Sequence, residues 1–257
     1  GAFTFLRFGV DNIPNTAELI DANGNINYDK ITSFSAADNA FIFSYGRKIG
    51  AVDGLSIGGN AKIIYRKVGD FAHAWGFGLD ASAQYKKANW YFGAMARDIT
   101  TTFSAWSFNL DQFKDVFAAT GNDMPTNSIE VALPRLILAA GHQFTIKKDF
   151  GVYPEINLDL TFDGKRNTLI SSNFTSIDPH IGLQLHYKNM LFLRTGVGNI
   201  QKETNSDGNR VTTLQPNIGV GIKVKRIALD YALTNVGGAS SAIYTNVFSL
   251  RIGINRN

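Results

Sequence analysis

Four histidines are the first candidates for chemistry in this sequence: His73, His142, His180 and His186. His180 and His186 alternate onto the same side of an expected strand. Six residues of strand separate their side chains by about 20 Å, which is too far for both to bind one metal ion. We therefore expect solvated histidines that line the interior of a barrel, and no metal site.

Glu155 and Asp159 are the next candidates, because they also share one side of an expected strand. Their separation of about 13 Å exceeds the roughly 5–9.5 Å between the paired carboxylates of glycosidases. We expect them to balance interior cations instead. These cations are Lys62, Arg66, Arg97, Arg194, Lys223 and Arg251.

Other catalytic signatures are absent from the sequence. There is no cysteine, hence no thiolate ligand or disulfide, and no Gly-x-Ser-x-Gly nucleophile elbow. The Gly-x-Gly segments that begin at Gly76, Gly196 and Gly219 lack the third glycine of a dinucleotide-binding loop. We interpret them as strand glycines that leave interior space and ease curvature. The sequence predicts a protein that is not an enzyme and that holds no cofactor.

Composition narrows the class of protein. The 257 residues carry a net charge of +4, with lysine and arginine scattered singly, so we expect no nucleic-acid partner. Charged residues make up 18%, below the roughly 25% of an average soluble domain. No uncharged run reaches the length of about 18 residues that a transmembrane helix needs.

Alternation of apolar and polar residues is the dominant pattern, and it predicts strands along the whole chain. In 213–224, for example, Ile218, Val220 and Ile222 alternate with Asn217 and Gly219. The pattern predicts one domain, 1–257, with twelve visible strands. They cover residues 2–10, 38–49, 55–68, 74–87, 90–100, 133–146, 152–163, 178–188, 190–199, 213–224, 226–236 and 243–254.

Strand and connection lengths favour a membrane. Most of these strands have nine to fourteen residues, where soluble sheets average about 5–6 and a tilted membrane strand needs about 9–11. Short connections alternate with long ones, as periplasmic turns alternate with external loops in outer-membrane barrels. We predict an all-β, transmembrane, antiparallel up-and-down β-barrel of a Gram-negative outer membrane, with the long loops extracellular and the C-terminus periplasmic. The aromatic residues expected at its two interfaces are Tyr45, Tyr65, Trp75, Tyr85, Trp90, Tyr187, Tyr231 and Tyr244.

The two longest predicted loops, 11–37 and 101–132, carry apolar residues that an external loop would expose. One or two helical turns are expected at 111–119 and one at 16–20. Such residues either pack on their own barrel, bind a partner or meet a ligand. The candidate partner-binding residues are Trp106, Phe108, Phe113, Phe117, Ile13 and Leu19.

Several segments resemble the PorV/PorQ family of Bacteroidota outer-membrane proteins, most closely its PorV-type members. They are Phe5–Thr16, Gly59–Tyr65, Ala74–Asp80, Ala96–Thr102, Leu133–Arg135, Ile177–His180 and Leu229–Leu233. The resemblance implies a FadL-like barrel, usually of fourteen strands, and therefore a further hairpin and a signal peptide before Gly1. It also implies work with the type IX secretion system, on secreted proteins that bear a C-terminal sorting domain.

Two functions remain open at this stage. The first is a non-enzymatic secretion component that binds or shuttles secreted proteins or translocon partners through its external loops, while its exterior contacts outer-membrane lipid and lipopolysaccharide. The alternative is a FadL-like transporter of a hydrophobic small molecule. A transporter should contain an enclosed apolar pocket, whereas a shuttle should present an apolar surface on its loops.

Overall fold

Strands account for most of the chain, in a computed structural model that describes residues 1–257 except 20–23, 111–113, 115–116, 119–120, 122, 125, 127, 206, 236–244 and 254–257. The elements are β1 (Ala2–Asn15), η1 (Tyr28–Lys30), β2 (Thr32–Lys48), β3 (Leu55–Val68), β4 (Ala72–Lys87), β5 (Trp90–Arg97), β6 (Thr102–Phe108), β7 (Ser128–Ala132), β8 (Arg135–His142), β9 (Phe144–Lys147), β10 (Phe150–Thr161), β11 (Ile170–Ser171), β12 (Ser176–Tyr187), β13 (Leu191–Thr204), β14 (Arg210–Val224), β15 (Ile227–Thr234) and β16 (Thr245–Ile252). Among the described residues, no helix is long and apolar enough to span a membrane.

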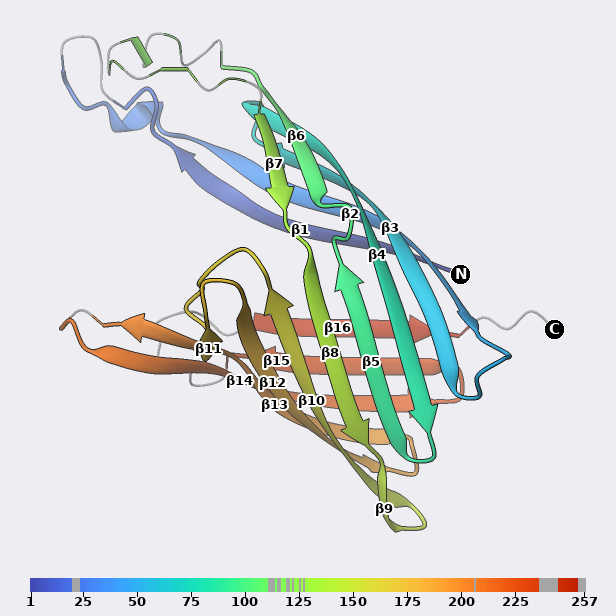
Figure 1. Ribbon diagram of the computed structural model, residues 1–257. Helices are drawn as coiled ribbons and strands as arrows, with labels where there is room; N and C mark the ends of the chain where they lie inside the picture. Colours follow the sequence, from blue (N-terminus) through green and yellow to red (C-terminus); the bar gives the residue numbers. More distant parts are fainter. Residues whose placement is uncertain are drawn as a thin grey trace. The chain divides into compact units, whose positions relative to one another are not determined.

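The strands follow one another in an antiparallel, up-and-down order (Figure 1). The main path of hydrogen-bonded neighbours is β1-β2-β3-β4-β5-β8-β10-β12-β13-β14-β15-β16. These twelve strands correspond one to one to the twelve strands predicted from alternation. The all-β, antiparallel, up-and-down prediction is therefore confirmed, and among the described residues the hydrogen-bonded order begins at β1 and ends at β16.

The predicted loop 101–132 is wrong over much of its length, because it contains β6 and β7. Asp98 and Thr101 have positive φ angles of 56° and 59°, and the Thr101 amide donates to the Asp98 carbonyl oxygen over 2.8 Å. This tight turn ends β5 and interrupts the alternation. The chain then resumes as β6, which pairs with the first residues of β4 and with β7.

The helical turns predicted in the two loops have different outcomes. Residues 16–19 form a hydrogen-bonded turn rather than a helix, because the Leu19 amide donates to the Thr16 carbonyl and the Asn15 side chain accepts from Ala17. Of the turns predicted at 111–119, Lys114, Phe117 and Ala118 are described and are helical. Phe113 lies outside the described residues.

Contacts divide the chain into two compact units. Unit 1 comprises Gly1–Gly46, Gly58–Ala81 and Asp98–Pro134, and unit 2 comprises Arg47–Ile57, Ser82–Arg97 and Arg135–Asn257. In each unit the strands carry apolar side chains on one side, which we call the apolar face. The opposite side is the polar face.

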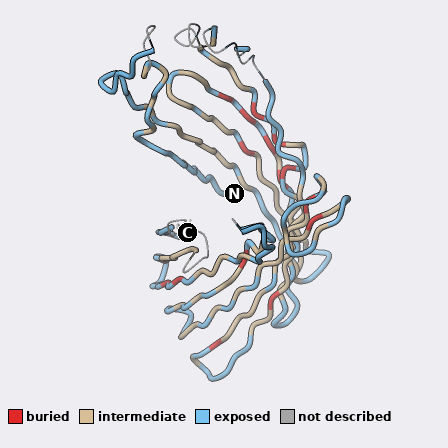
Figure 2. The backbone as a smooth tube through the Cα atoms, turned by 90° about the vertical axis from the view of Figure 1, so that its left-hand side faces the viewer, coloured by how far each residue is buried: buried red, intermediate tan, exposed pale blue. Residues whose placement is uncertain are grey.

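Few of the described residues are buried (Figure 2). The apolar faces are exposed, and the described residues contain almost no apolar core. In unit 2, Ile218, Val220 and Ile222 are 47%, 50% and 52% exposed. The buried hydrophobic residues in the described part of the chain are two alanines, Ala74 and Ala228. A soluble domain buries its large aliphatic side chains. Because this sheet does not, the contacts within it are mainly strand pairing and polar contacts.

The aromatic residues predicted for the interfaces all fall at positions of the apolar faces, apart from Tyr244, which lies outside the described residues. Tyr45, Trp75 and Trp90 are 66%, 55% and 50% exposed. Several pair across strands: Tyr65 with Trp75 at 4.7 Å and Tyr231 with Phe248 at 4.9 Å between ring centroids. The period-two pattern therefore predicted the orientation of these side chains correctly.

The turn between β2 and β3 depends on one glycine. Gly54 has φ +82°, and a Cβ at this position would lie 1.9 Å from the Lys86 carbonyl oxygen. The Lys86 amide donates to the Gly54 carbonyl over 2.9 Å, which holds the turn against β4.

Gly54→Ala should therefore lower the free energy of unfolding by at least about 1–2 kcal/mol, the cost of a left-handed conformation at a residue with a Cβ. Gly50→Ala in the same turn has no heavy atom within 4 Å of its new methyl group and should change stability by less than about 0.5 kcal/mol. Denaturant unfolding of both variants in detergent micelles measures the difference. Equal destabilisation would contradict the role of Gly54.

Candidate functional site

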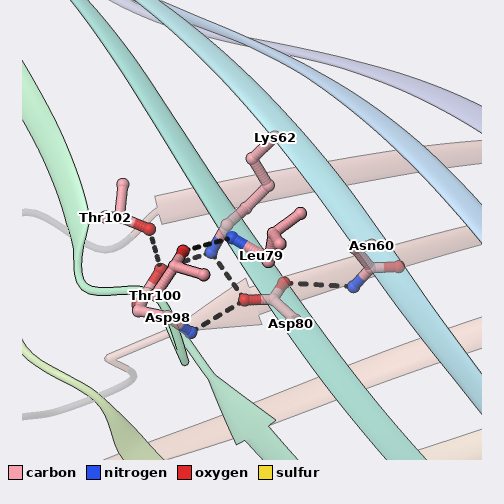
Figure 3. A network of polar contacts seen from close by, with 7 residues as sticks. All are labelled: Asn60, Lys62, Leu79, Asp80, Asp98, Thr100 and Thr102. Atoms are coloured by element: carbon pink, nitrogen blue, oxygen red, sulfur yellow. Dashed lines mark hydrogen bonds and ion pairs between the residues drawn. The ribbon is translucent and has the colours of Figure 1, made fainter.

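A buried ion network occupies the polar face of unit 1 (Figure 3). Lys62 of β3 donates to Asp80 of β4 over 2.7 Å and also to Asp98, which follows β5. The side chains of Lys62, Asp80 and Asp98 are 10%, 5% and 8% exposed. One ammonium group thus bridges two carboxylates that water barely reaches.

Neutral groups complete this network. Thr102 donates to Asp98 over 2.5 Å, Asn60 donates to Asp80 over 3.1 Å, and the Asp98 amide donates to Asp80 over 2.9 Å. The left-handed conformation of Asp98 turns this amide toward β4. Buried carboxylates need such donors, because an unsatisfied charge is costly away from water.

Glycine positions make room for the network rather than for open space. A Cβ on Gly78 would lie 1.8 Å from the Thr102 hydroxyl, and one on Gly76 would lie 2.5 Å from the Phe103 carbonyl oxygen. In unit 2, a Cβ on Gly221 would lie 2.3 Å from an Asp230 carboxylate oxygen. At Gly76, Gly78 and Gly221 the interpretation of open interior space is therefore wrong, because backbone or polar side-chain atoms of neighbouring strands occupy the space beside them.

A second cluster on the same face of unit 1 fixes Trp106. Arg66 binds Asp38 at 3.0 Å and Glu130 at 2.7 Å. The Trp106 indole N–H donates to Glu130 over 2.9 Å, and the Arg66 guanidinium lies 4.9 Å from the centre of its ring. Arg–carboxylate pairs and cation–π contacts of this kind hold an aromatic side chain in one orientation.

The predicted partner-binding residues do not lie together in one loop. Trp106 and Phe108 lie in strand β6 rather than in a loop, with their rings stacked 6.2 Å apart. Ile13 lies in β1 and Leu19 in the turn that follows it, and both are half-buried. Phe117 is half-buried and helical. Within the described residues, the structure brings Trp106 and Phe108 together.

Unit 2 contains its own ion pairs on the polar face. Arg194 binds Asp230 at 2.6 Å and Gln184 at 2.8 Å, and Arg251 lies 3.7 Å from Asp230. Arg135 binds Asp159 at 3.1 Å. Asp159 therefore pairs with Arg135, which was not among the predicted cations, and Glu155 accepts from Asn157 over 2.7 Å. The predicted cations Lys62, Arg66 and Arg194 pair with other carboxylates, so the partners predicted for Glu155 and Asp159 are wrong.

A pocket of about 870 Å³ lies at the turn end of unit 2. Tyr91, Tyr153, Glu155 and Lys86 line it. The two tyrosine rings meet edge to face at 5.6 Å, and the Lys86 ammonium lies 5.1 Å from the Tyr91 ring. Both aromatic and charged groups face this space, which fits an amphipathic occupant better than a purely apolar one.

The histidines divide between the two faces. On the polar face, His180 lies 3.4 Å from Asp178 and His186 lies near Phe192. His142 lies between Trp90 and Phe144 on the apolar face, at 4.5 and 4.2 Å. In the part of the chain that the structure describes, no three His, Cys, Asp or Glu side chains are placed to hold a metal ion.

Beyond the strands, Arg166 donates to both oxygens of Asp163 in the loop after β10. This hydrogen bond holds the pKa of the Asp163 carboxyl below its ordinary value, so the pair stays charged at neutral and mildly acidic pH. Among the described residues, charged side chains thus form ion pairs that stabilise the structure, as Asp163 and Arg166 do here.

Lys62→Met should leave Asp80 and Asp98 buried without their cation, and should lower the free energy of unfolding by about 3–5 kcal/mol. Lys30→Met breaks an exposed pair with Glu18, whose two side chains are 54% and 68% exposed, and should cost less than about 1 kcal/mol. Denaturant unfolding in micelles compares the two. A small loss for Lys62→Met would contradict the proposed importance of the network.

No family model matches the chain, and a comparison with curated proteins gives no match.

Proposed function

We propose that the chain spans a Gram-negative outer membrane, with its apolar faces toward lipid. The exposed aliphatic and aromatic side chains support this, because strands of outer-membrane barrels alternate lipid-facing apolar with interior polar residues. The polar faces carry the ion networks of both units. In the proposed orientation the long loops are extracellular and the short turns are periplasmic.

Val220→Arg tests this proposal, since Val220 is 50% exposed on the apolar face of β14. An arginine near the middle of the bilayer costs about 2–4 kcal/mol, so folding into lipid vesicles should fall sharply. Gln215→Arg places the same charge on the polar face of the same strand and should fold normally. Protease protection in vesicles gives the folded fraction, and equal folding of both variants would rule out lipid contact at Val220.

We further propose that the loop end of unit 1 binds protein partners, as a non-enzymatic component of type IX secretion. Trp106 and Phe108 are the anchors, because Arg66 and Glu130 fix the indole before any partner arrives. Pre-ordered aromatic side chains contribute heavily to interfaces. The resemblance to PorV-type proteins implies that these partners are secretion components or the sorting domains of secreted proteins.

Trp106→Ala combined with Phe108→Ala should reduce partner recovery in a native pull-down by tenfold or more, since one hot-spot residue contributes about 2 kcal/mol or more. Trp75→Ala with Phe77→Ala changes the opposite face of the neighbouring strand and should leave recovery unchanged. If the Trp106/Phe108 variant recovers its partners at the wild-type level, these two residues are not anchors for partner binding.

A second candidate function is transport of a hydrophobic small molecule that carries a polar headgroup, such as a fatty acid. The pocket of about 870 Å³, which is lined by both aromatic and charged groups, is the observation that favours it. Mass spectrometry of molecules bound to the purified wild-type protein separates the two candidates. Fatty acid or lipid recovered in place of protein partners would favour transport.

A further inference from the structure

The five short turns of unit 2 carry an excess of positive charge. The sheet runs up and down, so the turns that follow β2, β4, β9, β12 and β14 lie at one end of it (Figure 1). The basic residues there are Arg47–Lys48, Lys86–Lys87, Lys147–Lys148, Lys188 and Lys225–Arg226. These are nine of the 25 lysine and arginine residues of the chain.

Few carboxylates offset these cations. Asp53 and Asp149 are the acidic residues of the same turns, so nine positive and two negative groups give a net charge of +7. All nine cations are exposed. Among the described residues, Lys188 is the one of the nine with a carboxylate within 4.0 Å, at Asp149.

The opposite end of unit 2 has no such excess. Its charged residues at 162–175 and 202–210 are four cations and three carboxylates, and Arg166 there is bound to Asp163. The positive charge is thus a property of the turn end and not of the unit as a whole.

Aromatic residues of the apolar face lie next to these basic turns. Strand β5 begins at Trp90, directly after the Ala88–Asn89 turn. The Trp90 ring stacks on Phe92, with 6.0 Å between the ring centroids. Phe144 and Phe150, on either side of the Lys148–Asp149 turn, are 50% and 51% exposed. Aromatic rings beside lysines are typical of the boundary between acyl chains and headgroups.

We propose that the turn end of unit 2 binds the anionic headgroups of phospholipids in the leaflet that it faces. Exposed cations without carboxylate partners attract phosphate groups, and the adjoining rings place them at headgroup depth. Lys87 adjoins the Ala88–Asn89 turn that precedes Trp90, and Lys147 and Lys148 lie at the next turn along the chain at this end, after the strand β8 that pairs with Trp90. The proposal rests on the membrane-spanning function proposed above and adds the chemistry of the lipid.

Trp90 can report on this binding directly. A chain with Trp75→Phe and Trp106→Phe retains Trp90 as its single tryptophan. In vesicles, quenching by phosphatidylglycerol with brominated acyl chains is compared with quenching by brominated phosphatidylcholine. We expect an association ratio in favour of phosphatidylglycerol of roughly fivefold for each cation that the headgroup contacts, and a smaller ratio at high salt.

Charge-neutral variants assign this preference to the turns. Lys87→Gln, Lys147→Gln and Lys148→Gln together remove three of the nine cations and should lower the ratio measurably. The matched control is Lys165→Gln, Lys202→Gln and Arg210→Gln at the opposite end, which should leave it unchanged. A second reporter chain retains Trp75, which lies in β4 at the end remote from the turn, and should register no preference.

The outcomes separate the two proposals. Equal quenching by the two brominated lipids would overturn headgroup binding and leave the membrane-spanning proposal intact. Absence of quenching by either lipid would overturn both. A ratio that neutralisation of the three turn lysines leaves unchanged, or that Trp75 registers equally, would overturn its assignment to the turn end.

Discussion

Hydrogen bonding between neighbouring strands is the interaction on which this molecule depends, because its described residues bury almost no apolar side chains. The main path of twelve antiparallel strands pairs each interior strand on both sides. A soluble domain would compensate the entropy of ordering such a chain by burying a hydrophobic core. Here the large apolar side chains lie on the exposed face. The entropy lost on ordering the chain must therefore be offset by the strand pairs themselves or by contact of this face with an apolar solvent.

The polar faces follow from this arrangement. Because alternation places the apolar residues on one face, charged residues of neighbouring strands come together on the other face. Lys62, Asp80 and Asp98 form one such network, in which a single cation bridges two carboxylates. Glycines on the same face serve this packing, since Gly78 admits the Thr102 hydroxyl and Gly221 admits the Asp230 carboxylate. The small residues thus provide the space that the polar side chains of the ion networks occupy.

The interruption at Asp98–Thr101 links this packing to the surface proposed for partner binding. The turn aims the Asp98 amide at Asp80 and starts β6 beside β4. Strand β6 then carries Thr102, which binds Asp98, and Trp106, which is held by Arg66 and Glu130. The same strand therefore joins the buried network to the fixed aromatic pair of Trp106 and Phe108.

The sequence by itself determined the positions of twelve strands and the face on which each side chain lies. Both depend on a period of two residues, which is local: Val220 lies on the apolar face and Asn217 on the polar face because of their positions along the strand. The sequence pattern failed where local geometry broke the period, at Asp98–Thr101, so β6 and β7 were predicted to be loop.

Tertiary structure alone decided which charges meet. Lys62 lies 18 residues from Asp80 and 36 from Asp98, separations that only strand pairing can bring together. Nine of the 25 lysines and arginines, which appear scattered along the chain, are gathered at one end of unit 2 for the same reason. In an up-and-down antiparallel sheet every second turn lies at the same end, so residues far apart in sequence form one basic surface.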